Sequence, residues 1–384
     1  MKKFPKSLSQ KLQIREQNKA LRKLPLVNNL IDFASNDYLG FSQSETIFNE
    51  THEYLLENNI KVNGATGSRL ISGNHNLYPL TEDFIANFHQ AETALIFNSG
   101  YDANLGFFSS VPQRNDIIFY DELCHASIRD GIQMNHAKSY KFSHNNFAEL
   151  EQLIIKFITH NSQLTTIYIV TESVFSMDGD TPDLEELVTL SQKYNGYLVV
   201  DEAHAVGVFG NNGEGLVQSR GFHDKVFARI VTFGKGLGCH GAAVLGSEEL
   251  KNYLVNFARS FIYTTGLSPH SVATILFAYK KLENEKTALE HLKRNIQFFN
   301  QEKMQLGLKP LFVYSKSAIQ CAIIPGNEKV KSIAYQLQEK GFDVKAILSP
   351  TVPGGQERLR FCLHSYNSEE EITQVLQNLS KLVF

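Results

Sequence analysis

A lysine framed by glycines is the residue of this chain best suited to covalent chemistry. Lys235 lies in the run TFGKGLG, residues 232–238, directly after an apolar, β-rich stretch. If a strand ends there, the glycines let the backbone turn tightly and the amine projects toward the carboxyl edge of a sheet. Because a lysine in a glycine turn is more commonly just solvated, the neighbouring residues must decide between the two interpretations.

An acid and an imidazole follow a second apolar run. Residues 196–204 read GYLVVDEAH, the pattern of a buried strand that ends in Asp201 and is followed by His204. Pyridoxal phosphate needs a lysine to hold its aldehyde, an acid to keep its ring nitrogen protonated and donors for its phosphate. Asp201 suits the ring nitrogen, because a buried carboxylate needs a cation to meet it. His204 suits the phenolic oxygen, and the separation from Asp201 to Lys235 is long enough for one crossover to the next parallel strand.

The letters Asp-Glu-Ala-His also close the nucleotide site of many helicases. That site requires a phosphate loop of the form G-x-x-x-x-G-K-[ST]. Arg229 stands where the first glycine of such a loop would be, and Gly236 follows Lys235 in place of a hydroxyl residue. The run GNNGEG, residues 210–215, is not the dinucleotide pattern G-x-G-x-x-G either. The sequence therefore does not support a nucleotide site.

Composition indicates an ordinary soluble globular protein. The chain has 384 residues, 42% of them hydrophobic, and a formal net charge of −3. It can bury a large core and divide into two lobes. Its scattered lysines and arginines are no footprint of nucleic-acid binding, and no apolar run approaches membrane-spanning length. The four widely spaced cysteines show no disulfide or metal framework, so we expect a cytoplasmic protein without a metal site.

Residues 35–246 alternate short β-rich runs with helical stretches, which is typical of a parallel sheet covered on both faces. The expected strands are 93–97, 116–120, 166–171, 196–200, 229–233 and 242–246. The expected helices are 77–88, 147–159 and 183–194.

A different pattern follows a helical segment over residues 269–301. Strands are expected at 318–324, 342–348 and 358–363, with helices at 329–340 and 369–382. We therefore expect a helical arm over 1–35, a large cofactor-binding domain over 36–275 and a small α+β domain over 276–384.

Further candidate site residues follow predicted strands. Ser99, Gly100 and Tyr101 open a predicted helix, whose backbone N–H groups suit a phosphate. His125 comes just past a strand end, where its ring could stack on a cofactor ring. Adjacent residues rarely face one another, which argues against a catalytic pair of Cys124 with His125.

Hydroxyl and basic residues complete the set. In the run SMDGD, residues 176–180, the acids of a calcium loop are incomplete, so we expect a turn that aims Ser176 at the cofactor. Thr264 and Thr265 lie beside a turn. The run RLR, residues 358–360, alternates along a strand, so that one arginine can face a site and clamp a carboxylate while the other faces water.

Taken together, these motifs resemble the α-oxoamine synthases, pyridoxal-phosphate enzymes of aminotransferase-like fold that condense an amino acid with an acyl thioester and release carbon dioxide. The matching runs occur in the family's order: NDYLG at 36–40, GATGSR at 64–69, SMDGD at 176–180, DEAH at 201–204 and TFGKG at 232–236. The resemblance implies an α/β protein of fold type I, with a large, mostly parallel sheet domain and a smaller α+β domain.

The resemblance also implies roles for individual residues. Lys235 carries the cofactor, Asp201 meets its ring nitrogen and His125 stacks on its ring. Other cofactor atoms contact Ser99, Gly100, Tyr101, Ser176, His204, Thr232, Thr264 and Thr265, the two threonines reaching the neighbouring subunit of a homodimer. The positions that the family uses to bind substrate correspond in this sequence to Arg22, Asn36, Thr351 and Arg360. Two departures, Gly266 where a serine is usual and the run HSYN at 364–367, put the acyl-chain pocket in doubt.

Within the family, SAIQ at 317–320 and SPTVPGG at 349–355 are most similar to the members that join L-alanine to a pimeloyl thioester. The thioester's carrier, coenzyme A or an acyl carrier protein, stays open. The nearest alternative is a member that joins glycine to acetyl-CoA. An aminotransferase and a catalytically silent partner subunit are further alternatives, and the presence of Lys235 argues against the silent one.

Overall fold

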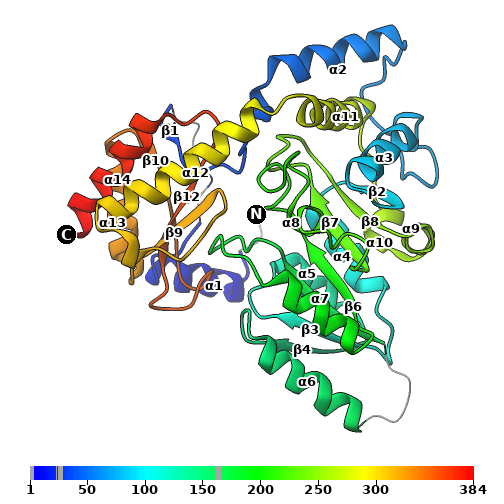
Figure 1. Ribbon diagram of the computed structural model, residues 1–384, viewed down its shortest axis with the longest axis horizontal. Coiled ribbons are helices and arrows are strands. Elements are labelled where there is room, and N and C mark those ends of the chain that lie inside the picture. Colours follow the sequence, from blue (N-terminus) through cyan, green and yellow to red (C-terminus); the bar gives the residue numbers. More distant parts are fainter. Residues whose placement is uncertain (1–3, 23, 25–28, 161–165) are drawn as a thin grey trace. The chain divides into compact units, whose positions relative to one another are not determined.

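The computed structural model describes residues 4–22, 24, 29–160 and 166–384 (Figure 1). Contacts within the chain divide it into two units. Unit 1 comprises residues 1–35, 177–179 and 294–384, and unit 2 comprises residues 36–176 and 180–293. The expected arm therefore belongs to unit 1, and the chain passes from unit 2 to unit 1 inside one long helix, α12 (Thr287–Gln305).

Unit 2 is built on a seven-stranded sheet with the order β2-β8-β7-β6-β5-β3-β4. The strands are β2 (Thr93–Phe97), β3 (Ile117–Asp121), β4 (Lys138–Phe142), β5 (Ile167–Glu172), β6 (Tyr197–Asp201), β7 (Ala228–Thr232) and β8 (Ala242–Gly246). Neighbouring strands in the series β4, β3, β5, β6 and β7 pair in parallel, whereas β8 is antiparallel to both β7 and β2. All the parallel strands, and β2, consequently end at the same edge of the sheet.

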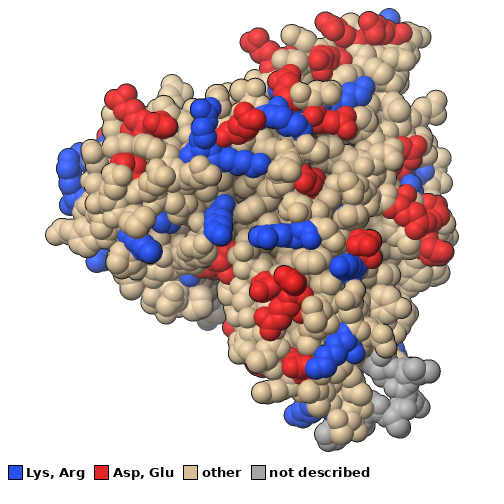
Figure 2. All heavy atoms as spheres, in the orientation of Figure 1, with Lys and Arg blue, Asp and Glu red and all other residues tan. Residues whose placement is uncertain are grey.

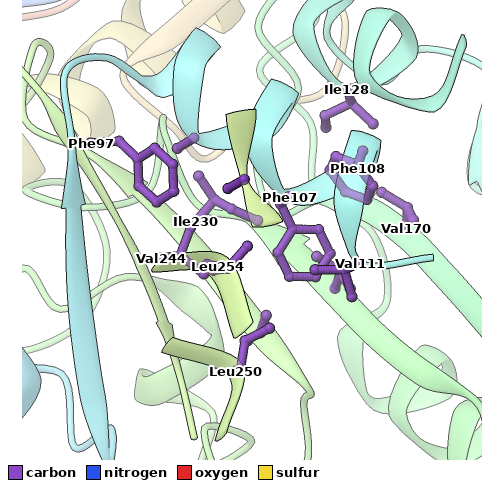
Figure 3. Close-up of a cluster of buried hydrophobic side chains, with 14 of the residues drawn as sticks. Phe97, Phe107, Phe108, Val111, Ile128, Val170, Ile230, Val244, Leu250 and Leu254 are labelled. Carbon is purple, nitrogen blue, oxygen red and sulfur yellow. The ribbon is translucent and has the colours of Figure 1, made fainter. Parts of the chain in front are cut away.

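Alternate residues of the sheet enter two separate cores. Val170 and Val199 belong to the cluster that Figure 3 shows, with Phe107 of α4 and Ile128 of α5. Their neighbours Ile169, Leu198 and Val200 belong to a second cluster with side chains of α6 and α7. Because side chains of a strand alternate between its faces, the two clusters lie on opposite faces of the sheet. Burial on both faces explains why the central strands read as continuous apolar runs.

Helices and short 3₁₀ turns connect these strands (Figure 1). Those within unit 2 are η1 (Phe41–Gln43), α2 (Glu45–Glu57), α3 (Leu77–Phe88), α4 (Gly100–Ser110), α5 (Ala126–Gln133), α6 (Phe147–His160), α7 (Leu184–Lys193), α8 (Leu216–Ser219), α9 (Glu248–Phe257), α10 (Arg259–Ile262) and α11 (Pro269–Asn284). Side-chain caps set several of their starts, as at α7, where Asp183 accepts hydrogen bonds from the backbone N–H groups of Glu185 and Glu186.

Unit 1 contains two small sheets and its own helices. A three-stranded antiparallel sheet has the order β11-β12-β9, and β1 pairs in parallel with β10. The elements are α1 (Lys6–Gln17), β1 (Ile31–Asp32), η2 (Lys309–Leu311), β9 (Ile319–Ile323), α13 (Asn327–Glu339), β10 (Phe342–Asp343), β11 (Lys345–Ile347), β12 (Arg358–Cys362) and α14 (Glu369–Val383). No residue of α1 is buried, as expected of an arm that has no core of its own.

The observed elements confirm the predicted fold class and most of the predicted strands and helices. The prediction missed β4, an edge strand whose sequence KSYKF is mostly exposed and therefore forms no apolar run. The single helical segment expected over 269–301 is two helices, α11 and α12, with no glycine or proline between them to signal the break. The strand expected over 342–348 is divided into β10 and β11.

Charge and hydropathy agree with the compositional analysis. On the face that Figure 2 shows, basic and acidic side chains are interspersed. Among the helices in the described ranges, none has the length and apolar character needed to cross a bilayer.

Candidate active site

Acidic residues occupy the carboxyl ends of three neighbouring parallel strands in unit 2. Asp121 ends β3, Glu172 ends β5 and Asp201 ends β6, with Glu172 and Asp201 paired directly across the ladder. Each is at most 5% exposed. The ends of these strands and of β2 and β7, with the loops that follow them, bring most of the cofactor-binding candidates to this edge, which is where open α/β sheets bind ligands.

The amine of Lys235 contacts His204 at this edge. The Nζ atom lies 2.7 Å from His204 Nε2, and His204 Nδ1 lies 2.7 Å from the hydroxyl of Tyr38. Tyr38 in turn donates to Asn36 Oδ1 at 3.2 Å. One hydrogen-bonded row thus joins Asn36, a predicted substrate contact, to the predicted cofactor-binding lysine.

The carboxylate of Asp201 is held from two sides. Its Oδ1 accepts the backbone N–H of Ala203 at 2.8 Å, and its Oδ2 accepts Asn104 Nδ2 at 2.8 Å. Neither donor is a cation. A buried carboxylate that meets only neutral donors within the described chain retains capacity for a cationic partner such as a protonated ring nitrogen.

His125 is the N-cap of α5. Its Nδ1 accepts the backbone N–H of Ser127 at 3.2 Å and lies 2.7 Å from Ser127 Oγ. Burial lowers the pKa of the His125 imidazole, Asp201 partly opposes that effect, and Lys235 adds to it. His125 is therefore a neutral ring at neutral pH.

Glu172 is a buried acid at this edge that the sequence did not indicate as a site residue. It is 2% exposed, and its Oε1 accepts the backbone N–H of His125 at 2.5 Å. Burial, reinforced by the nearby charge of Asp201, raises the pKa of Glu172 well above its ordinary value. Burial beside the charge of Asp201 therefore favours the protonated form of Glu172.

The start of α4 brings together the hydroxyl residues that the sequence predicts to contact a phosphate. Ser99 caps the helix by accepting the backbone N–H of Asp102, and a Cβ added to Gly100 would stand 3.4 Å from Thr232 Oγ1. The preceding Asn98 donates its Nδ2 to Thr264 Oγ1 at 3.2 Å and to the carbonyl of Thr265 at 2.6 Å. In unit 2 these hydroxyl residues gather at one helix N-terminus, an arrangement that favours anions.

Two cofactor candidates are less closely tied to this group. Tyr101 is 45% exposed, and its hydroxyl donates to Asp130 Oδ2 at 2.6 Å. Ser176 lies half-buried in the loop after β5.

Gly266 stands where a serine is usual in similar proteins. Its backbone N–H donates to the carbonyl of Gly67 at 3.0 Å. A Cβ at this position would approach the carbonyl oxygen of Gly73 to 3.0 Å and the hydroxyl of Tyr78 to 3.1 Å. This turn is therefore closely packed, and a side chain at position 266 would require Gly73 or Tyr78 to shift.

The remaining substrate candidates lie in unit 1. Arg22 Nη2 donates to Thr351 Oγ1 at 3.4 Å, so these two residues are neighbours although they are far apart in the sequence. Arg360 is 8% exposed, and its Nη1 lies 2.9 Å from Cys362 Sγ.

The expectation that one arginine of the run RLR faces water is wrong. Arg358 and Arg360 are 4% and 8% exposed, because residues two apart in a strand point to the same face. Arg358 forms an ion pair with Asp178 and donates to the carbonyl of Met177 at 2.9 Å. Arg358 therefore holds residues 177–179 within unit 1, and the carbonyl of Gly179 is bound there by the hydroxyls of Ser315 and Ser317.

Comparisons with known proteins identify the family. The family described as aminotransferase class I and II matches residues 28–379. A relative from Emericella nidulans, "8-amino-7-oxononanoate synthase", is 38% identical over 97% of this chain and 94% of its own length. The chain belongs to this aminotransferase family, and within it to the α-oxoamine synthases.

Solved structures of α-oxoamine synthases agree with the assignment. The 8-amino-7-oxononanoate synthase of Francisella tularensis superposes with a TM-score of 0.76 at 30% identity, over 92% of this chain and 98% of that one. The serine palmitoyltransferase of Sphingomonas wittichii superposes with a TM-score of 0.87 at 26% identity, over 98% and 96%. The predicted family and the predicted fold type I are thereby confirmed.

Pyridoxal phosphate, the cofactor of α-oxoamine synthases, fits the residues of this edge. Lys235 offers the amine, Asp201 a buried carboxylate with only neutral partners, and the start of α4 a set of anion donors. The buried Oδ1 of Asn104, beside Asp201, has no hydrogen-bond donor among the described residues. A buried acceptor without a donor is uncommon in a finished core and common where a further group binds.

Sequence reasoning missed the residues that support the predicted ones. Tyr38 and Asn104 stand inside runs that were recognised, NDYLG and the start of α4, and Ser127 follows His125 by two positions. The signal that could have indicated Asn104 is a polar residue on the buried face of a helix, four residues after its glycine start.

Proposed function

We propose that the protein condenses L-alanine with a pimeloyl thioester to give 8-amino-7-oxononanoate, carbon dioxide and a free thiol, a step of biotin biosynthesis. The observation that carries the proposal is the group of Lys235, His204, Asp201 and His125 at one sheet edge, in a chain whose relatives bear this enzyme's name. A relative from Halalkalibacterium halodurans, "Putative 8-amino-7-oxononanoate synthase", is also 38% identical, over 92% of this chain and 87% of its own length.

Each residue of the group has a definite task in this proposal. When bound, pyridoxal phosphate supplies a ring that withdraws electrons from the α-carbon of the amino acid. Lys235 first holds the cofactor and then moves the α-proton, with His204 positioned 2.7 Å from its Nζ. Asp201 keeps the ring nitrogen protonated, and Ser99, Gly100 and Thr264 bind the phosphate end.

Substrate contacts follow the family resemblance. Arg360 binds the carboxylate of the amino acid, because a guanidinium can clamp two oxygens at once. Thr351, held by Arg22, binds the acyl chain. We expect Thr351→Ala to raise mainly the KM for the pimeloyl thioester.

A turnover assay tests the function directly. Purified protein with pyridoxal phosphate is given pimeloyl-CoA or a pimeloyl carrier protein with L-alanine, and thiol release is measured with mass detection of the product. Faster turnover of glycine with acetyl-CoA would overturn the biotin assignment and leave only the family. Amine–keto exchange without thiol release would instead indicate an aminotransferase.

The cofactor-binding role of Lys235 has its own test. Borohydride reduction of the holoenzyme should attach the cofactor to the peptide that contains Lys235. Lys235→Ala should abolish turnover and labelling, whereas Lys225→Ala, which changes an exposed lysine, should alter neither. Labelling of a different lysine would refute the assignment.

We also propose a cytoplasmic homodimer. The segment between α2 and α3 exposes large apolar side chains, with Val62 56%, Leu70 51% and Ile71 86% exposed, as expected of a surface that a second copy covers. All four cysteines are free thiols, which suits a reducing compartment. Sedimentation would measure the assembly.

Mixed dimers of Lys235→Ala and Thr265→Ala chains test whether the threonines serve the partner's site. Regained activity supports exchange of these residues between subunits. Activity no higher than that of the separate variants would show that Thr264 and Thr265 act beside Asn98 of their own chain.

A further inference from the structure

Two residues without an assigned role connect Asp201 to His125. Asn104 of α4 is 2% exposed and Ser127 of α5 is fully buried. Asn104 Nδ2 donates to Asp201 Oδ2 at 2.8 Å and to Ser127 Oγ at 3.0 Å. Ser127 Oγ then lies 2.7 Å from His125 Nδ1. The four side chains form one continuous row within unit 2.

The groups at the two ends of the row, the Asp201 carboxylate and His125 Nδ1, determine which atom donates each hydrogen bond. A carboxylate only accepts, so the Asn104 atom beside Asp201 must be the amide nitrogen, and its second hydrogen points at Ser127 Oγ. The orphaned Asn104 Oδ1 agrees with that orientation, because a flipped amide would aim its oxygen at the carboxylate. His125 Nδ1 already accepts the backbone N–H of Ser127 at 3.2 Å, so this nitrogen is an acceptor and the hydroxyl of Ser127 gives its hydrogen to it.

These hydrogen bonds determine the tautomer of the His125 imidazole. His125 Nδ1 receives the hydroxyl of Ser127 and also its backbone N–H at 3.2 Å, so this nitrogen carries a lone pair and no proton. The proton of the neutral ring is then on Nε2. The position of His125 at the N-terminus of α5 acts in the same direction, since the helix dipole disfavours an imidazolium there.

We propose that Asn104 and Ser127 are positioning residues that hold His125 as the neutral Nε2–H tautomer, so that it acts on the acyl thioester as a hydrogen-bond donor and not as a base. This inference rests on the proposed function for the identity of the substrate. The tautomer itself depends only on the row of hydrogen bonds. Asn104 also restrains the carboxylate of Asp201, so the same amide positions both groups.

Other charged groups near His125 also influence the pKa of its imidazole. Asp201 and Asp130 favour its protonated form, whereas Lys235 and Arg129 oppose it, and Glu172 accepts its backbone N–H. Ser127→Ala leaves all of these in place and removes only the hydroxyl that stabilises the neutral ring. The pKa of His125 should then rise, because a donor to the neutral form disfavours protonation.

Imidazole ¹⁵N spectra of the holoenzyme test the tautomer without any substrate. The His125 signals are assigned by their loss in His125→Gln among the 13 histidines of the chain. In the wild type at neutral pH, Nδ1 should show the shift of an unprotonated nitrogen and Nε2 that of a protonated one. A wild-type ring with its proton on Nδ1, or on both nitrogens, overturns the proposal whether or not any variant folds.

Kinetics of the variants provide the second readout. Ser127→Ala and Asn104→Ala should move the acidic limb of kcat/KM for the thioester to higher pH and lower kcat/KM roughly tenfold, and the double variant should shift the limb no further than Ser127→Ala alone. Ser191→Ala is the matched control, because this hydroxyl of α7 is 1% exposed and donates only to the carbonyl of Val188. An unmoved limb and an unchanged tautomer in Ser127→Ala would refute the positioning role, even if the rate fell.

Discussion

His125 and His144 follow neighbouring strands at the same sheet edge of unit 2, yet their surroundings give them opposite charge states. His144 has one carboxylate on each ring nitrogen, with Nδ1 2.9 Å from Asp121 Oδ1 and Nε2 2.8 Å from Asp180 Oδ2. Burial alone would lower its pKa, but the hydrogen bonds to Asp121 and Asp180 outweigh burial and raise the pKa of His144 to about 10. His125 meets a hydroxyl and a backbone N–H instead, and its pKa is lowered.

The alternation of side chains along the strands separates the two histidines. Asp201 and Glu172 continue the face of Val199 and Val170, which packs against α4 and α5, so they meet Asn104 and His125. Asp121 continues the face of Phe119 in the other cluster and meets His144 there. An acid one residue earlier or later along a strand points to the opposite face of the sheet. The face of its strand thus decides whether the terminal acid meets Asn104 and His125 or forms an ion pair with His144.

The contrast teaches that burial of a histidine at a functional edge does not by itself indicate its task. A ring locked between two carboxylates has no free nitrogen to exchange protons and serves as a structural cation. A ring capped by neutral donors keeps one N–H available for a ligand. We therefore expect changes around His125 to affect chemistry and changes around His144 to affect stability.

The largest effect expected is that of Asp201→Asn. The amide keeps the shape of the side chain and one of its two accepted hydrogen bonds, from Asn104 or from Ala203, but cannot hold a proton on the cofactor's ring nitrogen. We expect kcat to fall by a factor on the order of 10³, about 4 kcal/mol, with cofactor still bound and little change in Tm. Asp121→Asn, measured in parallel, should instead lower Tm with little loss of kcat. Equal losses of rate and stability in both variants would break the comparison.

Arg360→Ala and Arg358→Ala extend the comparison to β12. Removing the proposed carboxylate clamp should lower kcat/KM for L-alanine by about 3 kcal/mol, roughly 100-fold, with normal unfolding. Arg358→Ala should mainly destabilise the protein, because it leaves Asp178 without its cation. Alanine saturation curves and denaturant unfolding of both variants measure the difference. An unchanged KM for alanine in Arg360→Ala would contradict its role.

His144→Gln should cost stability with little loss of kcat. Removing the cation leaves Asp121 and Asp180 facing one another, a penalty of about 2 kcal/mol once the partial exposure of the pair is considered. Denaturant unfolding at neutral pH provides the free energy of unfolding. A stable variant with abolished turnover would show that His144 belongs to the reactive group after all.

The smallest effect expected is a decline of stability at alkaline pH. Because the folded pKa of His144, about 10, lies above the unfolded value near 6.5, its contribution is complete below pH 6.5 and is lost as the pH rises through 10. The difference in unfolding free energy between the wild type and His144→Gln should therefore shrink from pH 7 to pH 10. A difference that stays constant over this range would disprove the ion-paired state.

Much of the fold and part of the site follow from the sequence. The apolar runs predict β2, β3 and β5 to β8 to within a residue or so, because strands buried on both faces must be apolar throughout. Lys235, Asp201 and His125 were predicted because chemistry gathers just past the ends of such strands. β4 escaped prediction because most of its side chains are exposed, whereas β2 at the other edge of the sheet is buried and reads as an apolar run.

The sequence alone determined the family and most of the sheet and predicted the reactive residues, since these depend on local patterns: apolar periodicity, glycine turns and motif order. Only the tertiary structure decided which partner each reactive residue meets. His144 reads as an ordinary loop histidine until the fold brings Asp121 and Asp180 to its two nitrogens, and Asn104 reads as a helix residue until Asp201 and Ser127 approach it. Charge state and tautomer are properties of these contacts between distant segments, and hydrogen bonds act over too short a range for the linear order of residues to specify them.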